Sequence, residues 1–572
     1  MRGVLPFARP YLWKYAVGLT FGLVVQFGVI LGPYFIRKSI DAIATGDGRY
    51  VQWALALVFL WSVVSLLSWA QRRLSVVASR EIEYEIRKAL FHKLLHLDFY
   101  FHARERVGDL MNKLNTDLNA VREFLGPGLN MGWRITWFVG MTAVAMFLVN
   151  PVLAAWMLVA VPPVFFVLRF LLALIHRRYR AAQEVFDKIS TFAQENFSGI
   201  RVVKGFAIEE RETARFQELN RQYIARSLAL ARVEGPLHAM MSLLMGFAAV
   251  LVLWIGGGMV VRGQMTLGEF VQFNTYLLQL SWPMLGLGWV MGLWQRGITS
   301  WARLDELFQA EPRIADGPGT DFGIREYAPE VRFERVRLEL GGREVISDLS
   351  LDIPAGRTLG VTGRTGSGKT MLARLIPRIL EADGGSVLVG GHPIKRIPLA
   401  VLRGHMAGVQ QEPFLFSETI AENIAFGFPE LDMERVVWAA KLAGVHDDIM
   451  AFPDGYQTLL GERGVTLSGG QRQRVALARA LARKPDVLIL DDAMSAVDTE
   501  TEDRILRGLR QVLGNQTTVL ISHRVSTLAH ADWIVVLENG RIAEEGTHAE
   551  LLAAGGRYAG LERMQRLSEE VG

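Results

Sequence analysis

The 572-residue sequence contains no cysteine, which excludes disulfides, thiol nucleophiles and cysteine metal sites. A strong excess of one charge is also missing. The formal net charge is only +4, and basic loops described below account for most of it, so we predict no nucleic-acid partner. We find no internal repeat and no low-complexity segment. The predictions of fold and function therefore rest on the hydrophobic pattern and on short motifs.

Apolar residues are abundant: half of the sequence is hydrophobic, and the mean hydropathy is +0.22. That value is high for a soluble enzyme with so much arginine. The excess lies in the N-terminal half, in six stretches of about 20 residues, which is the length of a membrane-spanning helix. These stretches are residues 15–36, 51–74, 126–149, 151–175, 236–261 and 267–294. Because backbone groups in hydrocarbon need partners within their own segment, we predict an α-helical six-span membrane bundle.

The charges of the loops orient the predicted bundle. Spans three and four are joined by little more than Asn150, and spans five and six by residues 262–266, so both turns are short. Segments 72–125 and 176–235 are long, basic and helical in pattern, which places them in the cytosol as long helices. Both termini then lie inside, and no cleavable signal peptide is expected. This predicts a multi-pass protein of the plasma or inner cell membrane, embedded in the lipid bilayer.

The hydrophobic pattern changes after residue 294. Residues 300–310 are predicted to form a short amphipathic helix, and proline, glycine and acidic residues follow in a linker, residues 311–330. From residue 331, short apolar strands alternate with helical patterns, as in a parallel α/β sheet. We therefore predict a membrane domain over residues 1–310 and an α/β domain over residues 331–572.

A phosphate loop opens this second domain. The pattern G-x-x-x-x-G-K-[ST] is matched by Gly363, Arg364, Thr365, Gly366, Ser367, Gly368, Lys369 and Thr370. Glycines allow consecutive N–H groups to face phosphate oxygens, the lysine reaches the β- and γ-phosphates, and the threonine hydroxyl can ligate Mg²⁺. We expect a strand over residues 359–361 and a helix over residues 371–380, whose N-terminal dipole adds to phosphate binding. Residues 331–572 are therefore predicted to form an α/β P-loop nucleotide-binding domain, which lies in the cytoplasm.

Two further motifs follow the loop. Leu467-Ser-Gly-Gly-Gln471 precedes Arg472-Gln-Arg474, and Leu488-Ile-Leu-Asp491 comes next. In this order the motifs resemble those of ATP-binding cassette (ABC) proteins, and over essentially its whole length the chain resembles an ABC exporter half-transporter. The resemblance implies ATP and Mg²⁺ as ligands. It also implies ATP hydrolysis coupled to the export of a hydrophobic or amphipathic substrate by alternating access.

The resemblance assigns roles to individual side chains. It makes Asp491, at the end of an apolar strand, a ligand of Mg²⁺ together with Thr370 and Gln411. Gln411 matches the lid glutamine, but Gln410 stands where the family usually has proline, so either glutamine could act. His523 matches the switch histidine that contacts the γ-phosphate.

Other motifs imply a second cassette. Ser468, Gly469, Gly470 and Gln471, leading into a helix expected to start near Gln471, match a signature that serves the ATP of the opposite cassette. Asp498 matches the loop that crosses the cassette interface. Residues 461–464 resemble a segment that reports cassette closure. The implied partner is another ABC half-transporter.

Asp492 departs from the family, which usually has glutamate there to polarise the attacking water. A shorter side chain sits about 1 Å back, which can cost about a hundredfold in rate. We favour a heterodimer in which this chain carries a degenerate site and lends its signature to the partner. The alternatives are a homodimer with Asp492 as the working base and a mainly regulatory nucleotide-binding subunit.

A second departure concerns the adenine contact. The family usually has tyrosine where this chain has Leu340, and loss of ring stacking removes about 1–3 kcal/mol. Leucine can still pack on the face of the base. This departure is consistent with a degenerate site but does not establish one.

The remaining expectations concern coupling and cargo. Residues 108–113 and 198–206 resemble the two intracellular coupling regions of exporters. Arg134 and Arg169 fall inside predicted spans, where a charge suggests function, although snorkelling or interhelical pairing is the alternative. Trp289 and Met291 suit an adaptable hydrophobic cargo surface, or ordinary packing. Six spans argue against a soluble ATPase, and fusion of both domains in one chain argues against an importer.

Overall fold

The computed structural model describes residues 2–461, 467–512 and 516–571. These residues form two compact units. The first consists of Met1–Leu95 and Val107–Ala310, and the second of His96–Arg106 and Glu311–Gly572. We describe each unit by itself.

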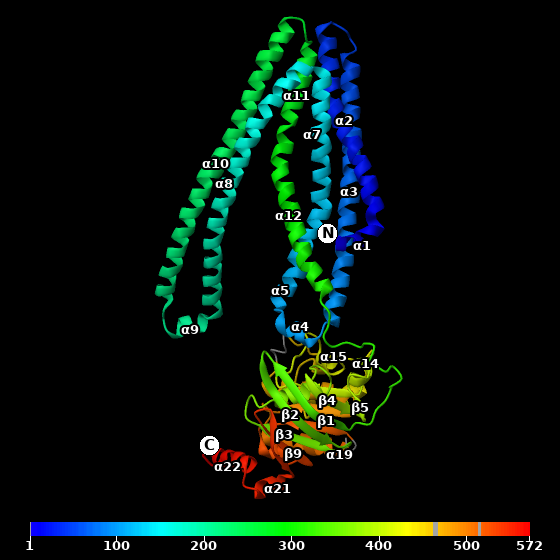
Figure 1. Cartoon of the computed structure of the whole chain (residues 1–572), viewed down its shortest axis with the longest axis vertical. Coiled ribbons are helices and arrows are strands. Elements are labelled where there is room, and N and C mark those ends of the chain that lie inside the picture. Colours follow the sequence, from blue (N-terminus) through cyan, green and yellow to red (C-terminus); the bar gives the residue numbers. More distant parts are fainter. Residues whose placement is uncertain (1, 462–466, 513–515, 572) are drawn as a thin grey trace. The chain divides into compact units, whose positions relative to one another are not determined.

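The first unit is helical (Figure 1). Its elements are η1 Arg2–Val4, α1 Leu5–Ala8, η2 Arg9–Tyr11, α2 Leu12–Ala44, α3 Tyr50–His96, α5 Val107–Asn112, η3 Lys113–Asp117, α6 Leu118–Glu123, η4 Phe124–Gly128, α7 Leu129–Val149, α8 Pro151–Ser198, α9 Ile200–Gly205, α10 Glu209–Val261, α11 Leu267–Gln279 and α12 Ser281–Gln309. The two short turns have local causes. The Asn150 side chain caps α8 by accepting from the Leu153 N–H, and Thr266 and Glu269 form a reciprocal capping box at α11.

Three helices of this unit are much longer than a membrane is thick. α3, α8 and α10 contain 47, 48 and 53 residues. At 1.5 Å per residue they measure about 70–80 Å, against about 30 Å of hydrocarbon. Each of these helices is therefore more than twice as long as the hydrocarbon layer is thick. Helices α8 and α10 lie along each other and are joined through α9 (Figure 1).

Among the described residues, three helical stretches are long and apolar enough to cross a membrane: Leu5–Ala44, Tyr50–His96 and Val107–Val149. A shorter apolar helix covers Gly246–Val261. The prediction of a helical membrane domain is confirmed, and the number of six spans stays a prediction.

The stretch expected as the sixth span is divided. Residues 267–294 fall in α11 and α12, which meet at Leu280. Pro283 lies in the first turn of α12, where its missing N–H costs nothing, and this position favours a new helix start. The short helix expected over residues 300–310 is instead the end of α12, which continues to Gln309.

The second unit is an α/β domain with two sheets, which confirms the predicted class (Figure 1). An antiparallel sheet has the order β2-β1-β4-β5, and a six-stranded sheet has the order β10-β9-β3-β8-β7-β6. Within the second sheet, β3 and β6 to β9 are parallel. The strands are β1 Val331–Leu340, β2 Arg343–Ile353, β3 Thr358–Gly363, β4 Gly384–Val389, β5 His392–Pro393, β6 Met406–Val409, β7 Val487–Asp491, β8 Thr517–Ile521, β9 Trp533–Glu538 and β10 Arg541–Gly546.

The second unit also contains helices. They are α4 Phe99–Arg104, α13 Lys369–Leu375, α14 Leu399–Gly404, α15 Ile420–Ile424, α16 Met433–Leu442, α17 His446–Met450, η5 Gly455–Gln457, α18 Gly469–Ala482, α19 Thr499–Val512, α20 Val525–Leu528, α21 His548–Ala553 and α22 Arg557–Val571. Strands β3, β7 and β8 are almost entirely buried, as expected for the centre of a parallel sheet.

Helix α4 comes from the N-terminal half of the sequence but folds with the second unit, so the domain expected over residues 1–310 is interrupted. The Asp98 carboxylate caps α4 through the Phe101 N–H and accepts from the Ile314 N–H at 2.9 Å. The guanidinium of Arg313 lies 4.7 Å from the Tyr100 ring centre. These contacts hold residues 96–106, whereas the expected coupling residues 108–113 lie in α5 and η3 of the first unit.

We expect Asp98→Ala to destabilise the second unit, because the substitution removes a helix cap and the acceptor of the Ile314 N–H. Loss of a cap costs about 0.5–2 kcal/mol. In the full-length protein, thermal unfolding should begin about 2–4 °C lower for each kcal/mol lost. Asp109→Ala, at an exposed position in α5, is the matched control. An unchanged transition for Asp98→Ala would show that these contacts do not hold α4.

Candidate functional site

Three neighbouring parallel strands end at one edge of the six-stranded sheet. Val361 of β3 pairs with Ile521 of β8, and Ile521 pairs with Asp491 of β7, so the three residues form one row. The residues that follow are the phosphate loop, His523 and Asp492. Carboxyl ends of parallel strands are the usual ligand sites of such sheets, and the pairing brings these three motifs to the same edge.

The phosphate loop has a backbone that requires glycine. Gly363, Gly366 and Gly368 have φ angles of +144°, +82° and +102°. A Cβ atom on Gly363 would lie 2.1 Å from the Leu537 carbonyl oxygen. The strand is longer than expected, Thr358–Gly363. The helix is shorter than expected, ending at Leu375, because Pro377 lacks the N–H that would continue it.

Lys369 is buried, and its ammonium group points into the loop. Its Nζ donates to the carbonyl oxygens of Gly363 at 2.8 Å and Arg364 at 3.0 Å. Burial lowers the pKa of Lys369, while the carboxylates of Asp491 and Asp492 act in the opposite direction. The loop thus holds a desolvated cation at the place where the motif predicts phosphates.

Asp491 is the buried carboxylate of the site. The Thr370 hydroxyl donates to its Oδ1 at 3.2 Å. Burial raises the pKa of Asp491, and the hydrogen bond from Thr370 partly offsets that effect. The buried hydroxyls of Thr362 and Ser367 have no hydrogen-bond partner among the residues that the structure describes. A hydroxyl and a carboxylate side by side, with unpaired hydroxyls nearby, fit a phosphate-bound Mg²⁺.

Asp492 follows directly on the same edge. Its φ of +50° is in the left-handed region, which aspartate tolerates better than most residues. Its N–H donates to the Ile521 carbonyl at 2.9 Å, so the backbone is fixed to β8. His523 is half-buried and lies two residues after the end of β8. The structure therefore gathers the phosphate loop, both aspartates and the histidine.

The two candidate lid glutamines follow β6. Strand β6 pairs with β7, with Val409 opposite Leu490. Gln410 lines a cavity of about 160 Å³ together with Asp491. Both Gln410 and Gln411 are exposed. Exposure does not distinguish the two glutamines, so both alternatives stay open.

The signature forms the start of α18, which begins at Gly469, two residues earlier than expected. The Ser468 hydroxyl accepts from the Gln471 N–H, and the Gln471 side chain accepts from the Ser468 N–H. This capping box explains the early start. A Cβ on Gly470 would lie 2.8 Å from the Ala496 carbonyl oxygen, so the signature packs on the loop that contains Ala496.

The next predictions concern Leu340, Asp498 and the segment 461–464. Leu340 ends β1 beside the turn to β2 and is half-buried against the core. Asp498 is exposed and accepts from the Thr501 N–H at 2.8 Å; this backbone hydrogen bond lowers the pKa of Asp498. In the reporting segment 461–464, residues 462–464 lie outside the described residues.

The cargo candidates belong to the first unit. Arg134 of α7 is half-buried, and its Nε has no hydrogen-bond partner within the described part of the chain. Trp289 and Met291 of α12 are exposed. The side chain of Arg169 lies outside the described residues. Exposure leaves Trp289 and Met291 available to lipid, cargo or another chain.

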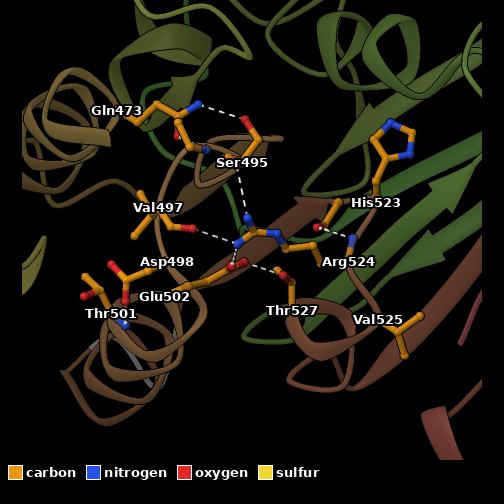
Figure 2. Close-up of polar contacts among 12 residues, drawn as sticks. Gln473, Ser495, Val497, Asp498, Thr501, Glu502, His523, Arg524, Val525 and Thr527 are labelled. Atoms are coloured by element: carbon orange, nitrogen blue, oxygen red, sulfur yellow. Dashed lines mark hydrogen bonds and ion pairs between the residues drawn. The ribbon is translucent and has the colours of Figure 1, made fainter. Parts of the chain in front are cut away.

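Three residues near the site have no role predicted from the sequence: Gln473, Glu502 and Arg524. Figure 2 shows that they surround the loop from Ser495 to Asp498. The one feature of the sequence that could have pointed to Arg524 is its position directly after His523. Its partners could not be found from spacing, because they lie 22 to 29 residues away.

A phosphate loop, a buried carboxylate and a histidine on adjacent parallel strands define a P-loop ATPase, here in one chain with a helical membrane domain. Residues 15–284 match the ABC transporter transmembrane region, and residues 346–495 match the family described as ABC transporter. The chain belongs to the ABC transporter family. It is a multi-pass membrane protein that couples ATP hydrolysis to transport.

Individual relatives match over nearly the full length. The chain is 33% identical to the uncharacterized ABC transporter ATP-binding protein YknU of Bacillus subtilis, over 97% of this chain and 94% of that protein. It is also 33% identical to the multidrug resistance-like ATP-binding protein MdlA of Escherichia coli, over the same shares. A solved structure of a bacterial Atm1-family ABC exporter with ATP bound superposes with a TM-score of 0.81 at 28% identity, covering 97% of this chain and 99% of that one. The predicted resemblance to an exporter half-transporter is confirmed.

We expect Gly363→Ala to weaken nucleotide binding, because its Cβ would meet the Leu537 carbonyl and its φ is in the left-handed region. Backbone strain of about 1–3 kcal/mol corresponds to a loss of about 5- to 150-fold in affinity. Binding of a fluorescent ATP analogue to the purified protein measures the loss. Gly317→Ala, which has open space around its Cβ, is the control. Equal affinities for both variants would contradict the structural reading of the loop.

Proposed function

We propose that this chain is one subunit of an ATP-driven exporter that moves hydrophobic or amphipathic substrates out of the cell by alternating access. The observation that carries this proposal is the row of β3, β8 and β7, which brings the phosphate loop, Asp491 and His523 to one edge. The same chain matches the structure of an exporter over 97% of its length. The substrate class rests on a relative named as multidrug resistance-like and on the exposed Trp289 and Met291. The second unit then faces the cytoplasm.

The site would hold ATP with Mg²⁺. Thr370 and Asp491 would ligate the ion, with Gln411 or Gln410 completing the protein ligands. When bound, Mg²⁺ neutralises charge on the phosphates. The chain itself supplies the loop N–H groups, the Lys369 ammonium and the His523 side chain at the γ-phosphate.

The signature would serve a second cassette. The first N–H groups of a helix have no partner within it, and those of α18 at Gly469 and Gly470 are available for a phosphate. Asp498 is exposed beside them and would lie at the interface of the two cassettes. One chain provides one phosphate loop and one signature, so two cassettes in head-to-tail arrangement complete two ATP sites.

We favour a different half-transporter as the partner. The Asp492 N–H is tied to β8, so the backbone cannot move forward to compensate for a side chain one methylene shorter than glutamate. A base set back by about 1 Å gives a slow site. The half-buried Leu340 offers no ring for stacking on adenine. This chain would hold the degenerate site, and its signature would complete the faster site of the partner.

The two alternative functions differ from this proposal in the identity of the partner or in which subunit hydrolyses ATP. In a homodimer, Asp492 would be the base at both sites, and its position on the same edge as Asp491 favours this reading over a non-catalytic role. In a mainly regulatory subunit, bound nucleotide would hold the cassettes together while the partner hydrolyses ATP.

Coupling to transport would involve residues 96–106. The Arg374 guanidinium lies 5.1 Å from the Phe99 ring centre. Arg374 is one turn beyond Thr370 on α13, so this cation–π contact joins the phosphate-loop helix to α4. The chain connects α4 on both sides to long helices, which would carry the movement.

We expect Asp492→Asn to change the ATPase activity of the complex by less than about twofold if the partner supplies the faster base, and Ser468→Arg to abolish most of it. The arginine would fill the space for the opposite phosphate. Ser468→Ala is the control, because it removes the cap, costing about 1 kcal/mol, without filling that space. Loss of turnover in Asp492→Asn alone would contradict the asymmetric arrangement.

We expect the complex isolated from its own membranes through a tag on this chain to contain a second, different half-transporter. Native mass spectrometry measures this directly. A mass of twice 63.9 kDa would establish a homodimer and make Asp492 the working base at both sites.

A further inference from the structure

Arg524, which follows His523, binds the loop from Ser495 to Asp498. Nη1 of Arg524 donates to the Val497 carbonyl at 2.8 Å, and Nη2 donates to the Ser495 carbonyl at 3.1 Å (Figure 2). The Arg524 N–H also donates to the Ser522 hydroxyl at 3.0 Å, which fixes the turn after β8. A planar guanidinium can make these divergent bonds together, whereas a lysine ammonium cannot match that geometry.

A buried acid orients this arginine. Glu502 of α19 is 3% exposed, and its Oε2 accepts from Nη1 of Arg524 at 2.5 Å. Its other oxygen accepts from the Thr527 hydroxyl. A buried carboxylate requires a cation and hydrogen bonds, so Glu502 fixes the guanidinium in one orientation.

The opposite side of the loop is held by the signature helix. Gln473 of α18 donates to the Ser495 hydroxyl at 2.9 Å and accepts from the Ala496 N–H at 2.8 Å. Gln473 lies two residues after the signature, and Arg524 follows His523 directly. The loop therefore connects the two motifs that the proposed function assigns to different ATP molecules.

Figure 2 also shows that the His523 ring points away from the contacts that Arg524 makes. We propose that Arg524 is a positioning residue that locks the 495–498 loop to the His523 turn, so that the switch histidine and the signature respond to nucleotide together. This inference rests on the proposed function, because it assumes that His523 and the signature serve two ATP sites.

The simplest competing role for Arg524 is neutralisation of Glu502. Three variants of the full complex separate the two: Arg524→Met, Glu502→Gln and the double variant. Removing the arginine alone leaves a buried charge, and the double variant removes that charge as well. If neutralisation were the whole role, activity would recover in the double variant.

We expect Arg524→Met to lower kcat for ATP about ten- to a hundredfold, as misplaced catalytic groups do, with the KM for ATP within about twofold of the parent. The double variant should stay equally low. Arg510→Met is the matched control, since Arg510 of α19 pairs with Asp532 at the surface. Recovery in the double variant, or unchanged kcat in Arg524→Met, would overturn the proposal.

Hydrogen exchange of the same proteins gives a readout that does not need turnover. ATP should protect residues 495–502 in the parent and in Arg510→Met, and protect them much less in Arg524→Met and in the double variant. Equal protection in all variants would contradict the locking role. A parent complex that binds ATP without any hydrolysis would contradict the proposed function instead, and the exchange measurement would still test the contact.

Discussion

The pairing of β3, β8 and β7 is the constraint on which the nucleotide site depends. Parallel pairing in register places Val361, Ile521 and Asp491 in one row, and each strand then delivers its following residues to the same edge. Because these strands are buried, the ammonium of Lys369 and the carboxylate of Asp491 are desolvated at this edge. That loss lowers the pKa of Lys369 and raises that of Asp491, and it gives both groups a strong preference for a charged ligand.

The same row explains why one methylene matters at Asp492. A surface aspartate can often replace glutamate by a small shift of the backbone. Here the N–H of Asp492 is bonded to β8, and the preceding residue lies within the sheet. The rigid backbone keeps the site well ordered, but it also cannot shift to compensate for the shorter side chain of Asp492. This is the physical basis for the asymmetric arrangement that we favour.

Arginines connect this rigid edge to its surroundings. Arg374 reaches from the phosphate-loop helix to the ring of Phe99, and Arg524 reaches from the switch turn to the loop before α19. Both side chains use the flat face or the diverging N–H groups of a guanidinium, which lysine does not provide. The arginine content of the chain thus serves internal contacts as well as loop charge.

The sequence by itself determined the class of both domains, the phosphate loop, the order of the motifs and the family, because these depend on local patterns of apolar residues and on fixed short spacings. It misplaced the ends of α13, α18 and α12, where Pro377, the Ser468 cap and Pro283 decide locally. Only the tertiary structure decided that α4 folds with the nucleotide domain and that Arg524 holds the 495–498 loop. Those contacts join residues far apart in the chain, such as Asp98 and Ile314, and no periodicity records which distant backbone groups will need a partner once buried.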